Sequence, residues 1–136
     1  MAMGQRKRES QAELFISHQD LPKSLGHPFY QRLNRLLEEK GFDEFVEAAC
    51  AKFYASVMGR PGLPPGVYFR MLLVGYFEGI DSERGIAWRS RDSLSLREFL
   101  GYSLNESVAE HSTVSRTRRL IDMETHSAVF TWILKR

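Results

Sequence analysis

The sequence predicts an all-α fold, a compact bundle of about six or seven helices. Apolar residues recur at the three- and four-residue spacing of buried helix faces across residues 28–134, and no segment alternates as a strand would. A length of 136 residues with 43% hydrophobic content is sufficient for one domain with its own core. We therefore expect a single helical domain over residues 27–136, preceded by a flexible N-terminal arm over residues 1–26.

The arm carries the basic run 6–8 and the apolar run 14–16. The basic run fits either a phosphate contact or a solvated terminus, and the apolar run fits docking on the core.

Pro28 then begins a helix that Gly41 ends, with an inner stripe of Phe29, Leu33, Leu36 and Leu37.

A second helix is expected to start near Asp43 and to pair antiparallel with the first, because few residues separate the two. Its inner residues are Phe42, Phe45, Val46, Ala49, Cys50, Phe53 and Tyr54. Residues 59–66 follow as a stiff loop of glycine and proline. The loop lacks the Lys-Ser/Thr ending of a phosphate-binding P-loop, so we interpret it as a connection.

The third helix, from Val67, is apolar around nearly its whole circumference and should be the central, most buried element. Gly75 and Gly79 would allow a neighbouring helix to approach closely. Ser82 is expected to cap a short helix from Glu83 to about Ser90, with Ile86, Ala87 and Trp88 facing inward.

Ser93 or Ser95 should cap the next helix, which ends at Leu100 with Leu96, Phe99 and Leu100 inside. A loop over residues 101–110 leads to a helix over residues 111–121. The last helix, from about Met123 to Leu134, has Val129, Phe130, Ile133 and Leu134 as its apolar side. Residues 82–122 thus resemble a helix-turn-helix unit, although the spacer before its final helix is longer than the usual tight turn.

The helix predicted over residues 111–121 has two chemically different faces. At about 100° per residue, Val114, Thr117 and Ile121 fall on one side, and small hydroxyls and guanidinium groups gather on the other. Such an outer face suits a DNA groove, because short side chains permit close approach and arginine can bind phosphate or guanine. An ordinary surface helix with its charged side in water is the alternative.

Charge and composition exclude several classes of function. Nineteen basic and 17 acidic residues give a net charge of +2, so any nucleic-acid contact must depend on local clusters. The single cysteine, Cys50, permits no intramolecular disulfide, and the four histidines lack a zinc-ligand spacing. No stretch resembles a secretion signal or a bilayer-spanning helix, so we expect a cytoplasmic protein.

Three strings carry a family resemblance. They are residues 63–89 (LPPGVYFRMLLVGYFEGIDSERGIAWR), 92–101 (DSLSLREFLG) and 111–119 (HSTVSRTRR). In this order they resemble the N-terminal domain of bacterial insertion-sequence transposases, the acidic-triad enzymes of the IS4/IS5-type superfamily. The similarity extends over about residues 27–134. Two dipeptides depart from the family pattern: Ala109-Glu110 replaces an expected Pro-Asp, and Ser90-Arg91 replaces small uncharged residues.

The resemblance implies a domain that precedes a ribonuclease-H-like catalytic domain, which carries an acidic triad and uses divalent metal (Mg²⁺). In such enzymes the front domain recognises the terminal inverted repeats of the element and helps to assemble the protein–DNA complex. The matching segments here are Ser82–Arg89 and Ser112–Arg119. A bacterial, nucleoid-associated location is implied as well.

The leading prediction is therefore DNA binding during transposition. In it Ser112, Thr113, Ser115, Arg116 and Arg119 face the groove, while Arg84, Arg89, Arg91 and Arg118 hold phosphates. The alternative is a subunit-assembly (dimerisation) module without base contacts, which would use the apolar side of the final helix. The expected partners are double-stranded DNA at transposon ends and other transposase subunits, with no membrane and no small-molecule substrate.

No catalytic role is expected for this chain. It stops at Arg136, ahead of any catalytic domain, and its own acidic groups lie on or beside predicted helix surfaces: Glu38/Glu39, Asp43/Glu44/Glu47 and Asp81/Glu83. Cleavage of DNA needs carboxylates that converge on metal ions from separate elements. We therefore expect no catalytic residue, no bound cofactor and no metal in this chain.

Overall fold

The computed structural model describes residues 2–5, 28–54 and 62–135, and within them the chain forms seven α-helices and no strand. The all-α prediction is confirmed. Most of the predicted arm and part of the 59–66 loop lie outside the described residues. The helices are α1 (Pro28–Glu39), α2 (Phe42–Cys50) with a 3-10 turn η2 (Ala51–Phe53), α3 (Pro65–Glu78), α4 (Glu83–Asp92), α5 (Leu94–Leu100), α6 (His111–Leu120) and α7 (Met123–Leu134).

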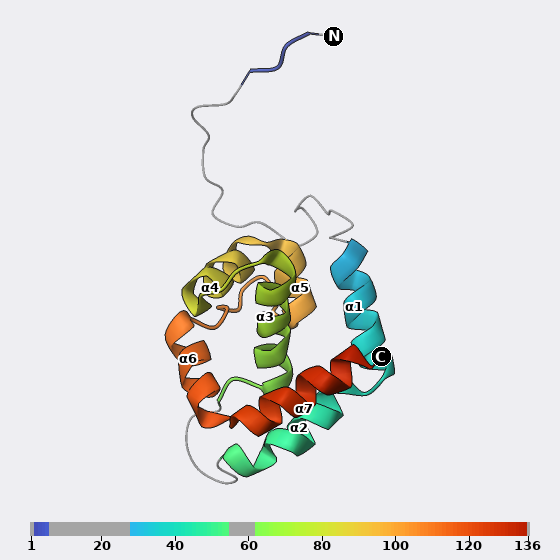
Figure 1. The fold of residues 1–136 in the computed structure, drawn as a ribbon. Coiled ribbons are helices and arrows are strands. Elements are labelled where there is room, and N and C mark those ends of the chain that lie inside the picture. Colours follow the sequence, from blue (N-terminus) through green and yellow to red (C-terminus); the bar gives the residue numbers. More distant parts are fainter. Residues whose placement is uncertain (1, 6–27, 55–61, 136) are drawn as a thin grey trace.

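Helix α3 lies in the middle of the molecule, and the other helices surround it (Figure 1). Most of its length is buried: Gly66, Tyr68, Phe69, Arg70, Met71, Leu73, Val74 and Gly75. The prediction of a central helix is confirmed for this part. Its last turn is different, because Tyr76 and Phe77 are exposed, and the ring of Phe77 packs edge-on against Phe29 of α1.

The two glycines near the end of α3 have different roles. A Cβ atom at Gly75 would lie 2.6 Å from Ile86 Cδ1 of α4, so the predicted close helix approach is confirmed there. Gly79 has open space around its Cα and a φ of 69°, in the left-handed region that favours glycine. It ends α3 as a C-cap, and the prediction of a helix contact at Gly79 was wrong.

Helices α1 and α2 meet at a corner. Gly41 has a φ of 72°, and this left-handed residue turns the chain between the two helices. Figure 1 shows α2 running across the end of α1, so the predicted antiparallel pair was wrong. The inner face of α1 also differs from the prediction, because Tyr30 is buried and Phe29 is exposed. The Tyr30 hydroxyl donates a hydrogen bond to Glu78 Oε2 at 2.6 Å, which satisfies its polar end.

The last helix closes the bundle against α2 and α3. Trp132 stacks on Phe45 of α2 with ring centroids 5.0 Å apart, and Phe130 packs edge-on against Phe69 of α3. Asp122 caps the helix by accepting a hydrogen bond from the Thr125 backbone N–H. The apolar side predicted for α7 is therefore largely covered by this chain: Val129 is buried, Phe130 and Ile133 are half-buried, and Leu134 is exposed.

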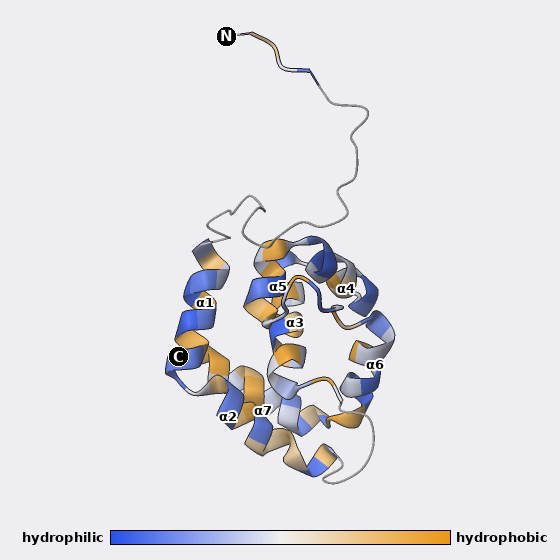
Figure 2. Cartoon of the chain, turned by 180° about the vertical axis from the view of Figure 1, so that it is seen from behind, coloured by the Kyte–Doolittle hydropathy of each residue, from blue (hydrophilic) through white to orange (hydrophobic). Residues whose placement is uncertain are grey.

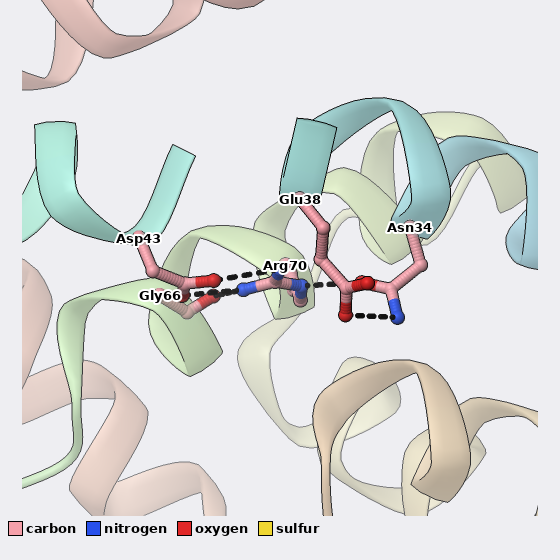
Figure 3. A network of polar contacts seen from close by, with 5 residues as sticks. All are labelled: Asn34, Glu38, Asp43, Gly66 and Arg70. Carbon is pink, nitrogen blue, oxygen red and sulfur yellow. Dashed lines mark hydrogen bonds and ion pairs between the residues drawn. The ribbon is translucent and has the colours of Figure 1, made fainter. Parts of the chain in front are cut away.

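A charged group is held inside the bundle between α1, α2 and α3 (Figure 3). The Arg70 guanidinium forms a two-pronged ion pair with Asp43, at 2.8 and 3.1 Å, and donates to Asn34 Oδ1 at 3.1 Å. It also donates to the Gly66 carbonyl and lies over the rings of Phe42 and Phe99. Asp43 lies at a helix surface, as the sequence predicted, since its side chain is 43% exposed, and it also neutralises the buried arginine.

Candidate nucleic-acid interface

Helix α6 packs on α4 through the face that its sequence predicts. Val114, Thr117 and Ile121, which follows the helix directly, are all buried. The Thr117 hydroxyl donates to the carbonyl of Thr113 at 2.9 Å, so this buried polar group is satisfied within the helix. The orientation of α6 is thereby fixed, and its opposite face is turned to solvent.

The solvent side of α6 carries Ser112, Arg116 and Arg119, which are all exposed. Within the described part of the chain, neither of these arginines has a hydrogen-bond or ion-pair partner. Figure 2 shows α4 and α6, seen from behind, largely in hydrophilic colours, whereas hydrophobic segments gather on α2, α3 and α5. Two uncommitted guanidinium groups, one turn apart on an exposed helix, can bind phosphate oxygens or a guanine edge.

Ser115 and Arg118 are not available in the same way. Glu83, in the first turn of α4, accepts a hydrogen bond from the Ser115 hydroxyl at 2.5 Å and pairs with Arg118 at 2.9 Å. These bonds, from Ser115 first and Arg118 second, lower the pKa of the Glu83 carboxyl, and the ion pair raises the pKa of Arg118. Glu83 thus connects α4 with α6, and it already binds the polar groups of two predicted DNA-contact residues.

The other predicted DNA-contact residues differ in whether their side chains already have a partner within the domain. Arg89 pairs with Glu78 at 2.6 Å, and Arg84 donates a long hydrogen bond of 3.4 Å to His111. The Arg91 side chain is exposed and has no partner in the described residues. Thr113, on α6, is half-buried. The structure therefore brings Arg84 beside the start of α6, while Arg89 is held by the end of α3.

Glu83 is the interface residue that the sequence did not reveal. Its partners Ser115 and Arg118 lie 32 and 35 residues away, and no local pattern announces a pair at that distance. Only the Ser82 cap, which accepts a hydrogen bond from the Gly85 backbone N–H, placed Glu83 in a helical first turn. Which helix would face that turn could not be deduced.

A groove of about 670 Å³ lies beside this interface and is lined by residues of α3, α4, α6 and α7. Its rim includes Met123 and Leu134, which are 78% and 79% exposed. On its wall, the Tyr68 hydroxyl is 2.7 Å from His126 Nε2, and His126 Nδ1 is 2.8 Å from the Asp122 carbonyl. A carbonyl can only accept, so Nδ1 carries a proton, and in the neutral imidazole Nε2 accepts from Tyr68.

One comparison with known proteins identifies the family. A family model described as a transposase domain (DUF772) matches residues 16–120, more than three quarters of the chain. The chain belongs to this transposase domain family. The match includes all of α1 to α6, and with them the candidate interface. No curated protein and no solved structure matches the chain.

The described residues of this transposase domain hold neither a cluster of metal ligands nor a helix that could span a membrane. Across residues 2–5, 28–54 and 62–135, no group of three or more His, Cys, Asp or Glu side chains is placed to hold a metal ion. In the same part of the chain, no helix combines the length and apolar character that crossing a bilayer requires.

Proposed function

We propose that this transposase domain binds DNA and recognises the terminal inverted repeats of an insertion sequence, with α6 as the recognition helix. The observation that carries the proposal is the exposed, unpaired state of Arg116 and Arg119 on a helix whose other face is buried. A helix fixed in this way presents its guanidinium groups without the cost of breaking an ion pair. Helices α4, α5 and α6 then act as a helix-turn-helix-like unit over residues 82–122.

The proposal assigns different tasks to the predicted residues. Arg116 and Arg119 contact bases and phosphates, with Ser112 and Thr113 permitting close approach at the start of α6. Arg84 and Arg91 bind phosphates from α4. In the free domain, Glu83 binds the side chains of Ser115 and Arg118, and Glu78 binds Arg89. These three residues contact DNA only where a phosphate group displaces the carboxylate.

The proposed parent enzyme is an acidic-triad transposase of the IS4/IS5 type. In it, DNA cleavage belongs to a ribonuclease-H-like domain that uses Mg²⁺, and the present chain contributes end recognition. An assay of nicking on supercoiled DNA with Mg²⁺ tests this division of labour, because cleavage by the chain alone would contradict it.

The test of recognition uses a duplex with the terminal repeat of the encoding element, read from the flanking genomic DNA, and a scrambled duplex as the reference. Fluorescence anisotropy should show weaker binding for the double variant R116A/R119A. The slope of log binding constant against log salt concentration should be less negative by about 1.8, because each lost phosphate contact contributes about 0.9. Unchanged affinity and slope would reject α6 as the DNA-binding helix.

Arg32 and Arg35 provide a matched control on α1. They have the same three-residue spacing as Arg116 and Arg119, and both are exposed. The variant R32A/R35A therefore removes the same net charge from another surface. Its binding should remain close to that of the wild-type chain, whereas an equal loss would indicate a general charge effect.

A second candidate function is subunit assembly, which the groove beside α6 and α7 favours. Its exposed rim residues Met123 and Leu134 form part of an apolar surface that a second subunit could cover. Sedimentation velocity over a range of concentrations distinguishes the two roles. A dimer that M123K/L134K abolishes would support assembly, and a strict monomer would reject it.

A further inference from the structure

Trp88 is exposed on the outer face of α4. The sequence predicted that it faces inward, but α4 buries Ile86, Ala87 and Ser90, and Trp88 is 61% exposed on the other side. An exposed tryptophan leaves a large planar apolar surface in water, whereas tryptophans are usually mostly buried. Trp132, the other tryptophan of the chain, is half-buried against Phe45 and shows the usual arrangement.

The charges around Trp88 are mainly positive. Arg84 and Arg91 lie about 40° and 60° from Trp88 around the helix, and both are exposed. Along the axis they are about 10 Å apart, with Trp88 between them. Asp92 is the acid on this face, and Arg89, at its edge, is paired with Glu78.

This face adjoins the candidate interface on α6. Arg84 is within hydrogen-bond distance of His111, the first residue of α6, and Glu83 holds Ser115 and Arg118 of the same helix. A polyanion bound along α6 therefore reaches the beginning of α4, and Trp88 lies one helical turn beyond that point.

We propose that Trp88 stacks on an unpaired base of DNA while Arg84 and Arg91 bind the phosphates on either side of that base. The inference rests on the proposed DNA-binding function and adds a second contact surface to it. An indole ring stacks on any base, and flanking guanidinium groups neutralise the backbone that a stacked base brings with it. The positive charge selects a nucleic acid over an apolar protein surface as the occupant.

The experiment compares two DNA probes, a short blunt duplex of mixed sequence and the same duplex with a single-stranded overhang of a few nucleotides. W88A should bind the overhang duplex about tenfold more weakly than the wild-type chain does, with little change for the blunt duplex. W88F, which keeps an aromatic face, should retain most of the affinity. Y76A is the control, because Tyr76 is another large aromatic residue, 73% exposed on another helix.

Fluorescence gives a readout that a change in folding would not mimic. In the W132F background, Trp88 is the single tryptophan, and its emission should be quenched as the overhang duplex is added. Circular dichroism of W88A should match that of the wild-type chain, because the exposed ring contributes little to the core.

Three outcomes would overturn the inference. Equal binding of both probes by W88A and the wild-type chain would remove Trp88 from the contact, as would binding without quenching. A dimer that W88A dissociates would assign Trp88 to a protein interface. If the wild-type chain binds the probes and substitution of Trp88 has no effect, the proposed DNA-binding function stands and only the role of Trp88 is rejected. If the wild-type chain binds no DNA, including the terminal repeat, both the function and the role of Trp88 are rejected.

Discussion

The ion pair between Arg70 and Asp43 gives the largest stability effect that we expect from a single polar substitution. Replacement of Asp43 by alanine leaves a guanidinium group that is only 7% exposed without its carboxylate. Loss of one partner of a buried pair costs about 3–5 kcal/mol. Arg70 keeps its bonds to Asn34 and Gly66, and Asp43 itself is 43% exposed, so we expect the lower limit, about 3 kcal/mol.

Urea unfolding measures this loss directly. With a denaturant slope of about 2 kcal/mol/M, the midpoint of D43A should fall by about 1.5 M. Glu44 is the matched control, because it is an exposed acid in the same first turn of α2. E44A loses the same interaction with the helix dipole but no ion pair, and should change stability by about 0.5 kcal/mol or less.

Gly66 offers an independent route to the same ion pair. A Cβ atom at this position would lie 2.0 Å from Asp43 Oδ1, so G66A should displace the carboxylate and destabilise the domain. If the effect acts through the pair, D43A/G66A should be about as stable as D43A alone. A D43A variant as stable as E44A, or fully additive losses in the double variant, would refute the reasoning. If D43A does not fold, D43N gives the same comparison with a smaller loss.

Three further predictions concern other contacts. The pKa of Glu83 is lowered by its bonds from Ser115 and Arg118, so these bonds stabilise the fold above the ordinary carboxyl pKa. The melting-temperature difference between the wild-type chain and E83Q should therefore shrink as pH falls below about 4.5, and a constant difference would contradict this. G75A should lower the urea midpoint, because its Cβ would lie 2.6 Å from Ile86 Cδ1, and the smaller partner in G75A/I86A should restore part of the loss. Burial raises the pKa of the Cys50 thiol, so a disulfide reagent should modify it only after unfolding, and rapid modification of the native chain would show that the site opens.

The helical faces were predictable where one helix packs by one continuous stripe. Leu96, Phe99 and Leu100 of α5 are all buried, as their spacing indicated, and the same holds for Val114 of α6. Periodicity failed where a helix meets several neighbours or reaches the end of the bundle. Trp88 of α4 is exposed for this reason, because α3, α5 and α6 cover the other sides of that helix.

The candidate site was predictable in its residue types but not in its pairings. The outward orientation of Arg116 and Arg119 follows from the apolar positions of α6, which any amphipathic helix reveals. Arg118 looked equivalent in the sequence, yet it pairs with Glu83, 35 residues away. Such pairs depend on how helices cross, and crossing geometry is set by packing that a single sequence does not display.

The contact between α2 and α7 has a consequence for how the chain folds. Phe45 and Trp132 are separated by 87 positions, so their stacking must wait for the ends of the domain to meet. Helices α4 to α6, in contrast, pair within a short stretch of chain. We therefore expect the half that carries the candidate interface to become structured early on the folding route, with the final helix docking as the last and slowest step.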